Sequence, residues 1–372
     1  MLSDRRLGTY HRVEEIWLRE KWRRDSDKLF RKVSLMMIIM TMIMIMMCEY
    51  NSLCNKVLAI KLYLQDLLAH FGCVNAVEWS DDGCVMVSGG DDTRVLVWNT
   101  DQALTSGQYQ PEKLSAEHES NIFCLSVDHE KRRVFSGGND AVVIVHDLVT
   151  RKPLDVCRHD EPVYGLSVHP DNNNIFLSAS SDGRVLLFDM RVRPEEDPLM
   201  IAGFSHAFHA AQFNPVEPRL IVSANQKHGI GLWDVRRPMR AVLEYGGLGG
   251  QQSSMYACWN SAGDKILGIR RRLSPVVYSV LSPAALAQFD HPGYYNSCTM
   301  KSCSFAGPDD EYVVSGSDDF NVYMWKVPDQ SDSGQWIPRA HAVIRGHRSI
   351  VNQVENLHHR VDSFDSLIAG EV

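Results

Sequence analysis

The sequence predicts an all-β fold, a β-propeller that follows a helical N-terminal extension. The first observation is a strand-ending aromatic residue or histidine that recurs at Trp98, His146, Phe188, Trp233, Tyr278 and Trp325. These positions lie 48, 42, 45, 45 and 47 residues apart, which matches the roughly 40–45-residue period of a four-stranded propeller blade. The second is that alternating apolar residues and turns rich in Gly, Ser and Asp precede most of these positions, as strands and tight turns require.

Composition and charge fit one large globular domain. Of the 372 residues, 44% are hydrophobic and 23% are charged, so the chain can bury a sizeable core. The net charge is −8, and residues 1–34 hold ten Lys/Arg against six Asp/Glu, or +4, which leaves −12 for the rest. Because a nucleic-acid-binding protein needs a clustered basic face, we expect no nucleic-acid partner.

The nine cysteines are odd in number and none has CxxC spacing. Most are embedded in apolar strands, a pattern typical of reduced thiols rather than of a disulfide framework or a metal site. We therefore expect an intracellular protein, in the nucleus and/or the cytoplasm, with no metal site and no cofactor.

Residues 1–60 form an extension ahead of the repeats. Residues 10–33 have the spacing of an amphipathic helix. Residues 35–48 are an uninterrupted apolar run of 14, shorter than the roughly 18–20 residues of a membrane-spanning helix, and the long region before it argues against a signal peptide. A membrane partner is therefore not expected. The run is a weak anchor, a helix packed on the propeller, or an extension with no defined place in the fold.

The first repeat is the most complete one and predicts a buried hydrogen-bond network. His70, Ser88, Asp92 and Trp98 stand where their side chains can tie three strands together. We expect this set to be structural rather than catalytic. Just ahead of it, residues 63–68 are predicted to supply the outer strand that closes the ring.

The later repeats keep this set unevenly. Equivalent residues of the second and third repeats are His118, Ser136, Asp140, His159, Ser178 and Asp182. In the fourth repeat Phe204 replaces the histidine and Lys227 the aspartate, so we expect its network to be broken. The fifth repeat carries the basic run 270–272 in place of the small polar turn.

The propeller is predicted to occupy residues 61–354 on a seven-bladed plan with an incomplete last blade. The sixth repeat regains the polar turn at 315–319, and the seventh begins at 346 but loses the pattern after 354. We expect an inner strand at 350–354, an outer strand from 63–68 and nothing between them, and a tail at 355–372.

Five stretches are more specific than the generic repeat. They are residues 70–75 (HFGCVN), 120–125 (SNIFCL), 213–220 (FNPVEPRL), 295–303 (YNSCTMKSC) and 315–325 (SGSDDFNVYMW). On these stretches the chain, from about residue 66 to 354, resembles the WD-repeat substrate receptors of cullin-4 RING ubiquitin ligases. The resemblance implies a seven-bladed, non-catalytic ring that presents proteins for ubiquitination, with the ligase adaptor, the cullin-4 complex and protein substrates as partners.

The resemblance also implies that a WD-x-Arg motif contacts the adaptor. The motif is complete at Trp233, Asp234 and Arg236, and recurs at Asp189 and Arg191 after Phe188. An arginine just past a strand end can offer a planar, bidentate fork to an acceptor on a partner. The alternative is that both arginines simply cover the neighbouring blade.

Substrates are expected on one face of the ring, where the loops before the inner strands meet the tight turns. The repeat phase places eight candidate residues there: Asn75, Asp91, Phe123, Tyr164, His209, Arg271, Lys301 and Asp318. A solvated rim without a dedicated ligand is the alternative for any one of them.

Two further classes of protein compete with the receptor. One is a WD-repeat scaffold that assembles complexes without a ligase, because a fold alone does not assign function. The other is an enzyme, which is disfavoured because the sequence contains no nucleophile elbow, Walker loop or HExxH motif.

Overall fold

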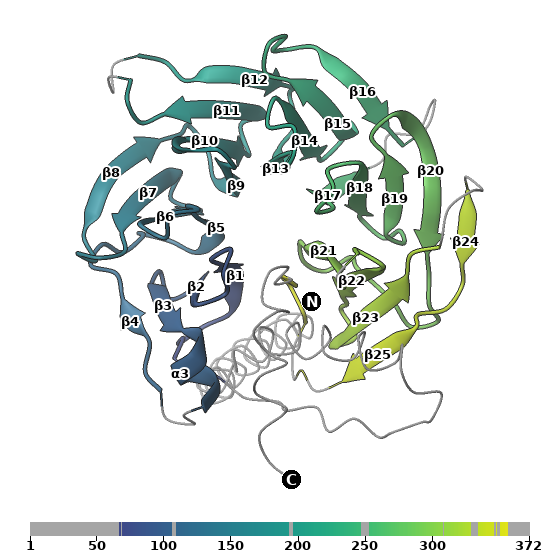
Figure 1. Ribbon diagram of the computed structural model, residues 1–372, viewed down its shortest axis with the longest axis horizontal. Helices are drawn as coiled ribbons and strands as arrows, with labels where there is room; N and C mark the ends of the chain where they lie inside the picture. Colours follow the sequence, from purple (N-terminus) through teal and green to yellow (C-terminus); the bar gives the residue numbers. More distant parts are fainter. Residues whose placement is uncertain are drawn as a thin grey trace, which may run out of the picture.

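The computed structural model describes residues 67, 69–105, 109–192, 196–246, 253–307, 309–328, 334–345, 347 and 350–355. Within them, six antiparallel sheets stand around a central opening, one for each of the first six repeats (Figure 1). The all-β propeller prediction is thus confirmed. The predicted helix and apolar run of residues 1–60, and the tail beyond 355, lie outside the described residues.

Each sheet has the same order of four strands from the axis outward. The inner strands are β1 (Val74–Trp79), β5 (Ile122–Val127), β9 (Val163–His169), β13 (Phe208–Phe213), β17 (Ser254–Trp259) and β21 (Cys303–Ala306). The second strands are β2 (Val85–Gly90), β6 (Arg133–Gly138), β10 (Asn172–Ser180), β14 (Leu220–Asn225), β18 (Lys265–Arg270) and β22 (Tyr312–Gly316). The third strands are β3 (Val95–Asn99), β7 (Val142–Asp147), β11 (Arg184–Asp189), β15 (Gly229–Asp234), β19 (Val276–Ser279) and β23 (Asn321–Lys326).

The outer strands are β4 (Glu112–Lys113), β8 (Pro153–Arg158), β12 (Leu199–Gly203), β16 (Ala241–Tyr245), β20 (Ser282–Phe289) and β25 (Ala342–Arg345). Two further elements have no counterpart in the repeat. The short helix α3 (Thr100–Thr105) follows β3, and β24 (Gln335–Ile337) pairs in parallel with β20. The chain between β23 and β25 therefore crosses to the fifth sheet.

Apolar side chains between neighbouring sheets form the core. Between the first two sheets, Val87 and Val95 pack on Ile122 and Leu125, all 5% exposed or less. The approach is close, because a Cβ added at Gly89 would lie 2.7 Å from Cγ2 of Ile122. Glycine at this point of β2 lets the sheets meet face to face.

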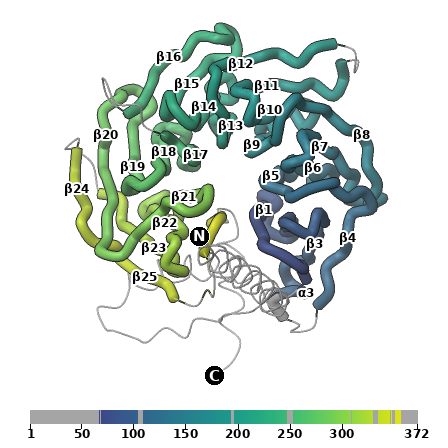
Figure 2. The backbone as a smooth tube through the Cα atoms, turned by 180° about the vertical axis from the view of Figure 1, so that it is seen from behind, coloured from purple at the N-terminus to yellow at the C-terminus, as the bar shows by residue number. Residues whose placement is uncertain are grey.

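Residues 350–355 lie between the first and sixth sheets, where the ring would otherwise be open (Figure 2). The Gln353 side chain donates to the Val77 carbonyl (2.9 Å) and accepts from the Val77 N–H (3.0 Å). On the other side, the Ser302 N–H donates to the Asn352 carbonyl (3.0 Å), and Val354 packs against the sixth sheet. The segment thus occupies the predicted place of the seventh inner strand, without forming a regular strand.

The predicted outer strand at 63–68 lies outside the described residues except for Leu67. That side chain is 5% exposed and belongs to the cluster on the free face of the first sheet, with Trp79 and Trp98. Six blades are observed within the described residues.

Candidate functional site

Strand direction separates the candidate residues onto two faces of the ring. Inner and third strands are both antiparallel to the second strand, so they run in the same direction. The starts of the inner strands, at Asn75 and its equivalents, therefore share a face with the turns between second and third strands. We call this the upper face. The ends of the third strands, followed by Arg191 and Arg236, lie on the opposite, lower face.

A cavity of about 380 Å³ lies on the ring axis. The repeat phase brings seven strand-start positions together in its wall: Asn75, Phe123, Tyr164, His209, Met255, Lys301 and Asn352. Five of these are predicted substrate-face residues. The other three, Asp91, Arg271 and Asp318, lie outside the cavity wall.

Two of those residues, Asp91 and Asp318, contact residues of the wall, and Arg271 contacts the neighbouring loop. The Asp91 carboxylate accepts a hydrogen bond from Asn75 Nδ2 (2.8 Å). The Arg271 guanidinium donates to the Ser297 carbonyl (3.1 Å). Asp318 forms an ion pair with Lys301 (2.7 Å). The geometry therefore gives them a positioning place beside the cavity, and contact with a substrate stays a prediction for all eight residues.

Three ring-bearing side chains form a continuous arc on one side of the cavity. The ring centroids of Phe123 and Tyr164 lie 5.4 Å apart, and those of Tyr164 and His209 lie 5.6 Å apart, edge to face. His209 Nδ1 lies 3.0 Å from the Ser254 carbonyl, so this nitrogen carries the proton. Burial, together with the charge of Arg271, lowers the pKa of His209, and the arc presents neutral aromatic surface.

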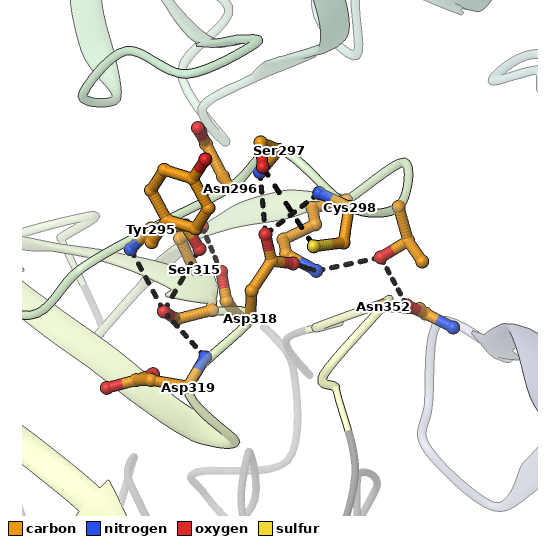
Figure 3. A network of polar contacts seen from close by, with 12 residues as sticks. Tyr295, Asn296, Ser297, Cys298, Ser315, Asp318, Asp319 and Asn352 are labelled. Atoms are coloured by element: carbon orange, nitrogen blue, oxygen red, sulfur yellow. Dashed lines mark hydrogen bonds and ion pairs between the residues drawn. The ribbon is translucent and has the colours of Figure 1, made fainter.

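A buried ion pair occupies the other side of the cavity. Lys301 is 2% exposed, and its Nζ lies 2.9 Å from Thr299 Oγ1 as well as beside Asp318. Figure 3 shows the Asp318 carboxylate directed at the Ser297 and Cys298 amides, at 2.6 and 2.9 Å. Burial lowers the pKa of Lys301, which Asp318 opposes. The lysine charge is thus neutralised in place.

The deeper part of the cavity is polar and acidic. Glu78 follows Asn75 by three positions on β1, about 10 Å further along the strand at roughly 3.3 Å per residue, and lines the same cavity with Gln212 and Tyr256. Gln212 Nε2 donates to the Tyr256 hydroxyl (2.9 Å). Burial and then the charge of Glu355 raise the pKa of Glu78 well above its usual range. The negative charge of Glu355 therefore disfavours a second negative charge on Glu78.

The hydrogen-bond network of the first repeat is present. His70 Nδ1 lies 2.9 Å from Asp92 Oδ1, His70 Nε2 lies 2.8 Å from Ser88 Oγ, and Trp98 Nε1 donates to the same oxygen (2.9 Å). His118 makes the equivalent contacts with Asp140 and Ser136 in the second sheet. These groups are buried within the sheets, away from the cavity, in a structural arrangement.

The other sheets depart from the predicted set. In the third, His159 reaches Ser178 (2.8 Å), while Asp182 pairs with Arg184. In the fourth, the ring of Phe204 stacks on His228 with centroids 4.1 Å apart. The fourth network therefore lacks its histidine, as predicted, and is broken at that position.

The fourth sheet retains one bond of the set, and the sixth rebuilds the set with another residue. Trp233 Nε1 still donates to Ser223 Oγ (2.8 Å). In the sixth sheet the Tyr294 hydroxyl, 3.0 Å from Ser315 Oγ, takes the place of the histidine. Trp325 Nε1 donates instead to the Asp290 carbonyl (2.8 Å).

The two lower-face arginines have the same geometry in adjacent blades. Arg191 donates from Nε to Asp189 Oδ1 (2.8 Å) and from Nη2 to Oδ2 (2.6 Å). Arg236 holds Asp234 in the same way, at 3.0 and 2.6 Å. The arginine side chains are 59% and 63% exposed. Each aspartate fixes its guanidinium at the surface, and Arg236 holds the pKa of Asp234 at about 2.

Trp233 belongs to the interior instead. It is 3% exposed and packs between the third and fourth sheets with Phe213 and Ile221. Of the predicted adaptor-binding residues, the two arginines are therefore the most exposed, and Trp233 can act only by shaping the strand that precedes Arg236.

Sequence reasoning missed Glu78, Glu355 and Tyr294. For the first two, the signal was their place three residues after a strand-start position, Asn75 or Asn352. A spacing of three puts side chains on opposite sides of a regular strand, and Glu78 lines the cavity together with Asn75 because the register of β1 shifts between Val74 and Ala76. Tyr294 had no such signal, since it stands three residues after the histidine of its repeat. Within the described ranges, no three His, Cys, Asp or Glu side chains form a metal-binding group.

The described cysteines carry free thiols, and Cys298 is the exposed one among them. In the same described part of the chain, no helix combines the length and apolar character needed to cross a bilayer. The apolar run at 35–48 lies outside these residues.

Comparison with known proteins agrees with the geometry. The family model described as "WD domain, G-beta repeat" matches residues 62–99, 151–189 and 290–326. DDB1- and CUL4-associated factor 5 from Mus musculus and from Homo sapiens are each 53% identical to the chain over 297 residues. That alignment covers 79% of this chain and 31% of either relative.

A plant relative is more distant. Protein ALTERED SEED GERMINATION 2 from Arabidopsis thaliana is 32% identical over 156 residues, which cover 38% of this chain and 19% of that protein. The chain spans about a third of the length of the DDB1- and CUL4-associated factor 5 proteins that it matches. By its repeats, its six sheets and this similarity, the chain is a WD-repeat β-propeller protein, and over 79% of its length it is similar to the DDB1- and CUL4-associated factor 5 proteins.

Proposed function

We propose that the chain is a non-catalytic substrate receptor that docks on the adaptor of a cullin-4 RING ubiquitin ligase and presents proteins for ubiquitination. The observation that carries the proposal is the pair Asp189–Arg191 and Asp234–Arg236, repeated with the same geometry on the lower face of adjacent blades. The names of the mouse and human relatives, which specify association with DDB1 and CUL4, supply the partner.

Pre-organisation gives the arginine pair its value. Two of the guanidinium nitrogens of Arg191 and Arg236 are held by the neighbouring aspartate, so little side-chain freedom is lost when the remaining N–H groups bind an acceptor. Arginine is also enriched among the residues that dominate interface energies. The two groups stand at the same place in adjacent blades, on the same face.

The two faces then divide the work. The lower face carries the arginines, and the upper face carries the cavity and its rim. A receptor of this kind holds the ligase and the substrate at the same time, because the two sites lie on opposite ends of the ring. The proposal includes an intracellular location, in the nucleus and/or the cytoplasm, and a seven-bladed plan completed through residues 350–355 and 63–68.

Co-purification tests the proposal. Tagged full-length chain carrying Arg191→Ala and Arg236→Ala is expected to lose the adaptor and cullin-4 from cell extracts. Arg184→Ala is the matched control, because Arg184 also pairs with the aspartate two residues before it, Asp182, but stands at the start of β11, on the upper face. Unchanged co-purification of the double variant would favour a WD-repeat scaffold without a ligase.

A further inference from the structure

The axial cavity has two layers with different chemistry. The upper layer has the Phe123–Tyr164–His209 arc on one side. The deeper layer has Glu78 beside Gln212 and Tyr256. Aromatic faces carry negative charge at the ring centre and attract cations, so both layers favour the same kind of guest.

The charges around the cavity favour a cation as guest. Among the described residues of the wall, Lys301 is the one with a permanent positive charge, and Asp318 neutralises it at 2.7 Å. Glu78 lies near Glu355 and Asp81, whose negative charges disfavour its ionisation. A positive group at this depth would relieve that repulsion, and a neutral or acidic group would not.

We propose that the cavity accepts a basic side chain, lysine or arginine, from a substrate protein, with its stem against Phe123 and Tyr164 and its charged head toward Glu78. The peptide backbone stays at the mouth, on the upper face. Only these two side chains combine a long apolar stem with a terminal cation. The volume of about 380 Å³ lies at the small end of the range for ligand pockets and suits a side chain or two rather than a folded element.

The inference rests on the proposed function, because it names the substrate class of the upper face. It does not involve the lower face. Peptide binding to the purified chain and adaptor binding can therefore be measured separately, and one can fail while the other holds.

The probe is a set of fluorescent heptapeptide libraries with one fixed central residue and six randomised positions. The fixed residue is Arg, Lys, citrulline, Leu or Glu, and fluorescence polarisation with the full-length protein reports binding. We expect the Arg and Lys libraries to bind at least about fivefold more tightly than the citrulline and Leu libraries, and the Glu library to bind most weakly.

Glu78→Gln tests the acidic end, because it keeps the shape and removes the charge. The preference for Arg and Lys should fall to less than about twofold in this variant. Glu119→Gln is the matched control: Glu119 is exposed in the loop before β5, on the upper face, and is not part of the cavity wall. This control removes the same charge from the same face and should keep the preference.

Three results would overturn the inference: equal binding of the basic and citrulline libraries, a preference that survives Glu78→Gln, or equal losses in Glu78→Gln and Glu119→Gln, which would indicate only the general negative charge. Glu355→Gln serves as the second variant if Glu78→Gln does not fold, and it should weaken the preference in the same direction. Retained adaptor co-purification by Glu78→Gln separates failure here from failure of the proposed function.

Discussion

Replacing Ser88 with alanine should destabilise the propeller more than the same change at Ser223. Ser88 Oγ contacts two buried groups, His70 Nε2 at 2.8 Å and Trp98 Nε1 at 2.9 Å. Ser223 Oγ accepts a hydrogen bond from Trp233 Nε1 but has no histidine partner, because Phe204 stands where the histidine would be. The two serines occupy equivalent positions in the second strands of the first and fourth sheets.

The expected magnitudes follow from the number of groups left unpaired. A buried polar group without a partner costs about 1–3 kcal/mol. Ser88→Ala leaves two such groups, in residues that are 7% and 1% exposed, so it should lower the free energy of unfolding by about 2–6 kcal/mol. Ser223→Ala leaves one, so its loss should be about 1–3 kcal/mol.

Urea denaturation of both variants, followed by far-ultraviolet circular dichroism, gives the comparison. Hydrogen exchange measured on peptides from β1–β3 and from β13–β15 shows whether each loss is local. Equal losses for Ser88→Ala and Ser223→Ala would refute the view that the histidine is part of the stabilising network.

Two further predictions concern buried charge. Burial lowers the pKa of His146 from 6.5 to about 4, so the folded protein loses stability as the pH falls from 6.5 to 4, where only the unfolded chain takes up this proton. His146→Phe should remove about 3 kcal/mol of that acid-dependent loss. The measurement is the shift of the urea midpoint between pH 7 and pH 4.5, and an equal shift in the wild type and the variant would contradict the prediction. Lys301→Met should lower the free energy of unfolding by about 3–5 kcal/mol, because it leaves the Asp318 carboxylate without its cation. The double variant Lys301→Met/Asp318→Asn should recover part of that loss. If Lys301→Met melts at the same temperature as the wild type, the pair contributes little to stability.

The fold followed from the sequence because the repeat phase is a strong signal. The alternation in the inner strands and the spacing of the strand-ending residues predicted that Asn75, Phe123 and Tyr164 share a face, and all three line the axial cavity. Side chains with period-two spacing on equivalent strands must face the same axis. The repeat phase alone therefore predicted which strand-start residues lie together around the axis.

Other features depend on contacts that a repeat pattern does not encode. The three-residue strand β24 pairs in parallel with β20, 48 residues earlier at the Ala287–Gln335 pair, and no local pattern marks so short an element. Tyr294 replaces a histidine from a different position in the chain, by reaching the same serine oxygen with a longer side chain. Such substitutions conserve the position of a polar atom and not that of a residue.

The sequence predicted the position of the two arginines but not their side-chain contacts. The motif placed Arg191 and Arg236 past a strand end, but their pairing with Asp189 and Asp234 needed side-chain geometry. That pairing explains why the aspartate belongs to the motif: it fixes the fork of the arginine at the surface. In the proposed docking, we expect the aspartate to position the arginine rather than to contact the adaptor.

The affinity of the purified chain for the purified adaptor tests the central claim most directly. In a calorimetric titration, Arg191→Ala/Arg236→Ala should weaken binding at least about tenfold, while Arg184→Ala leaves it unchanged and all three proteins melt at similar temperatures. Equal affinities of the wild type and the double variant would contradict docking through the lower face.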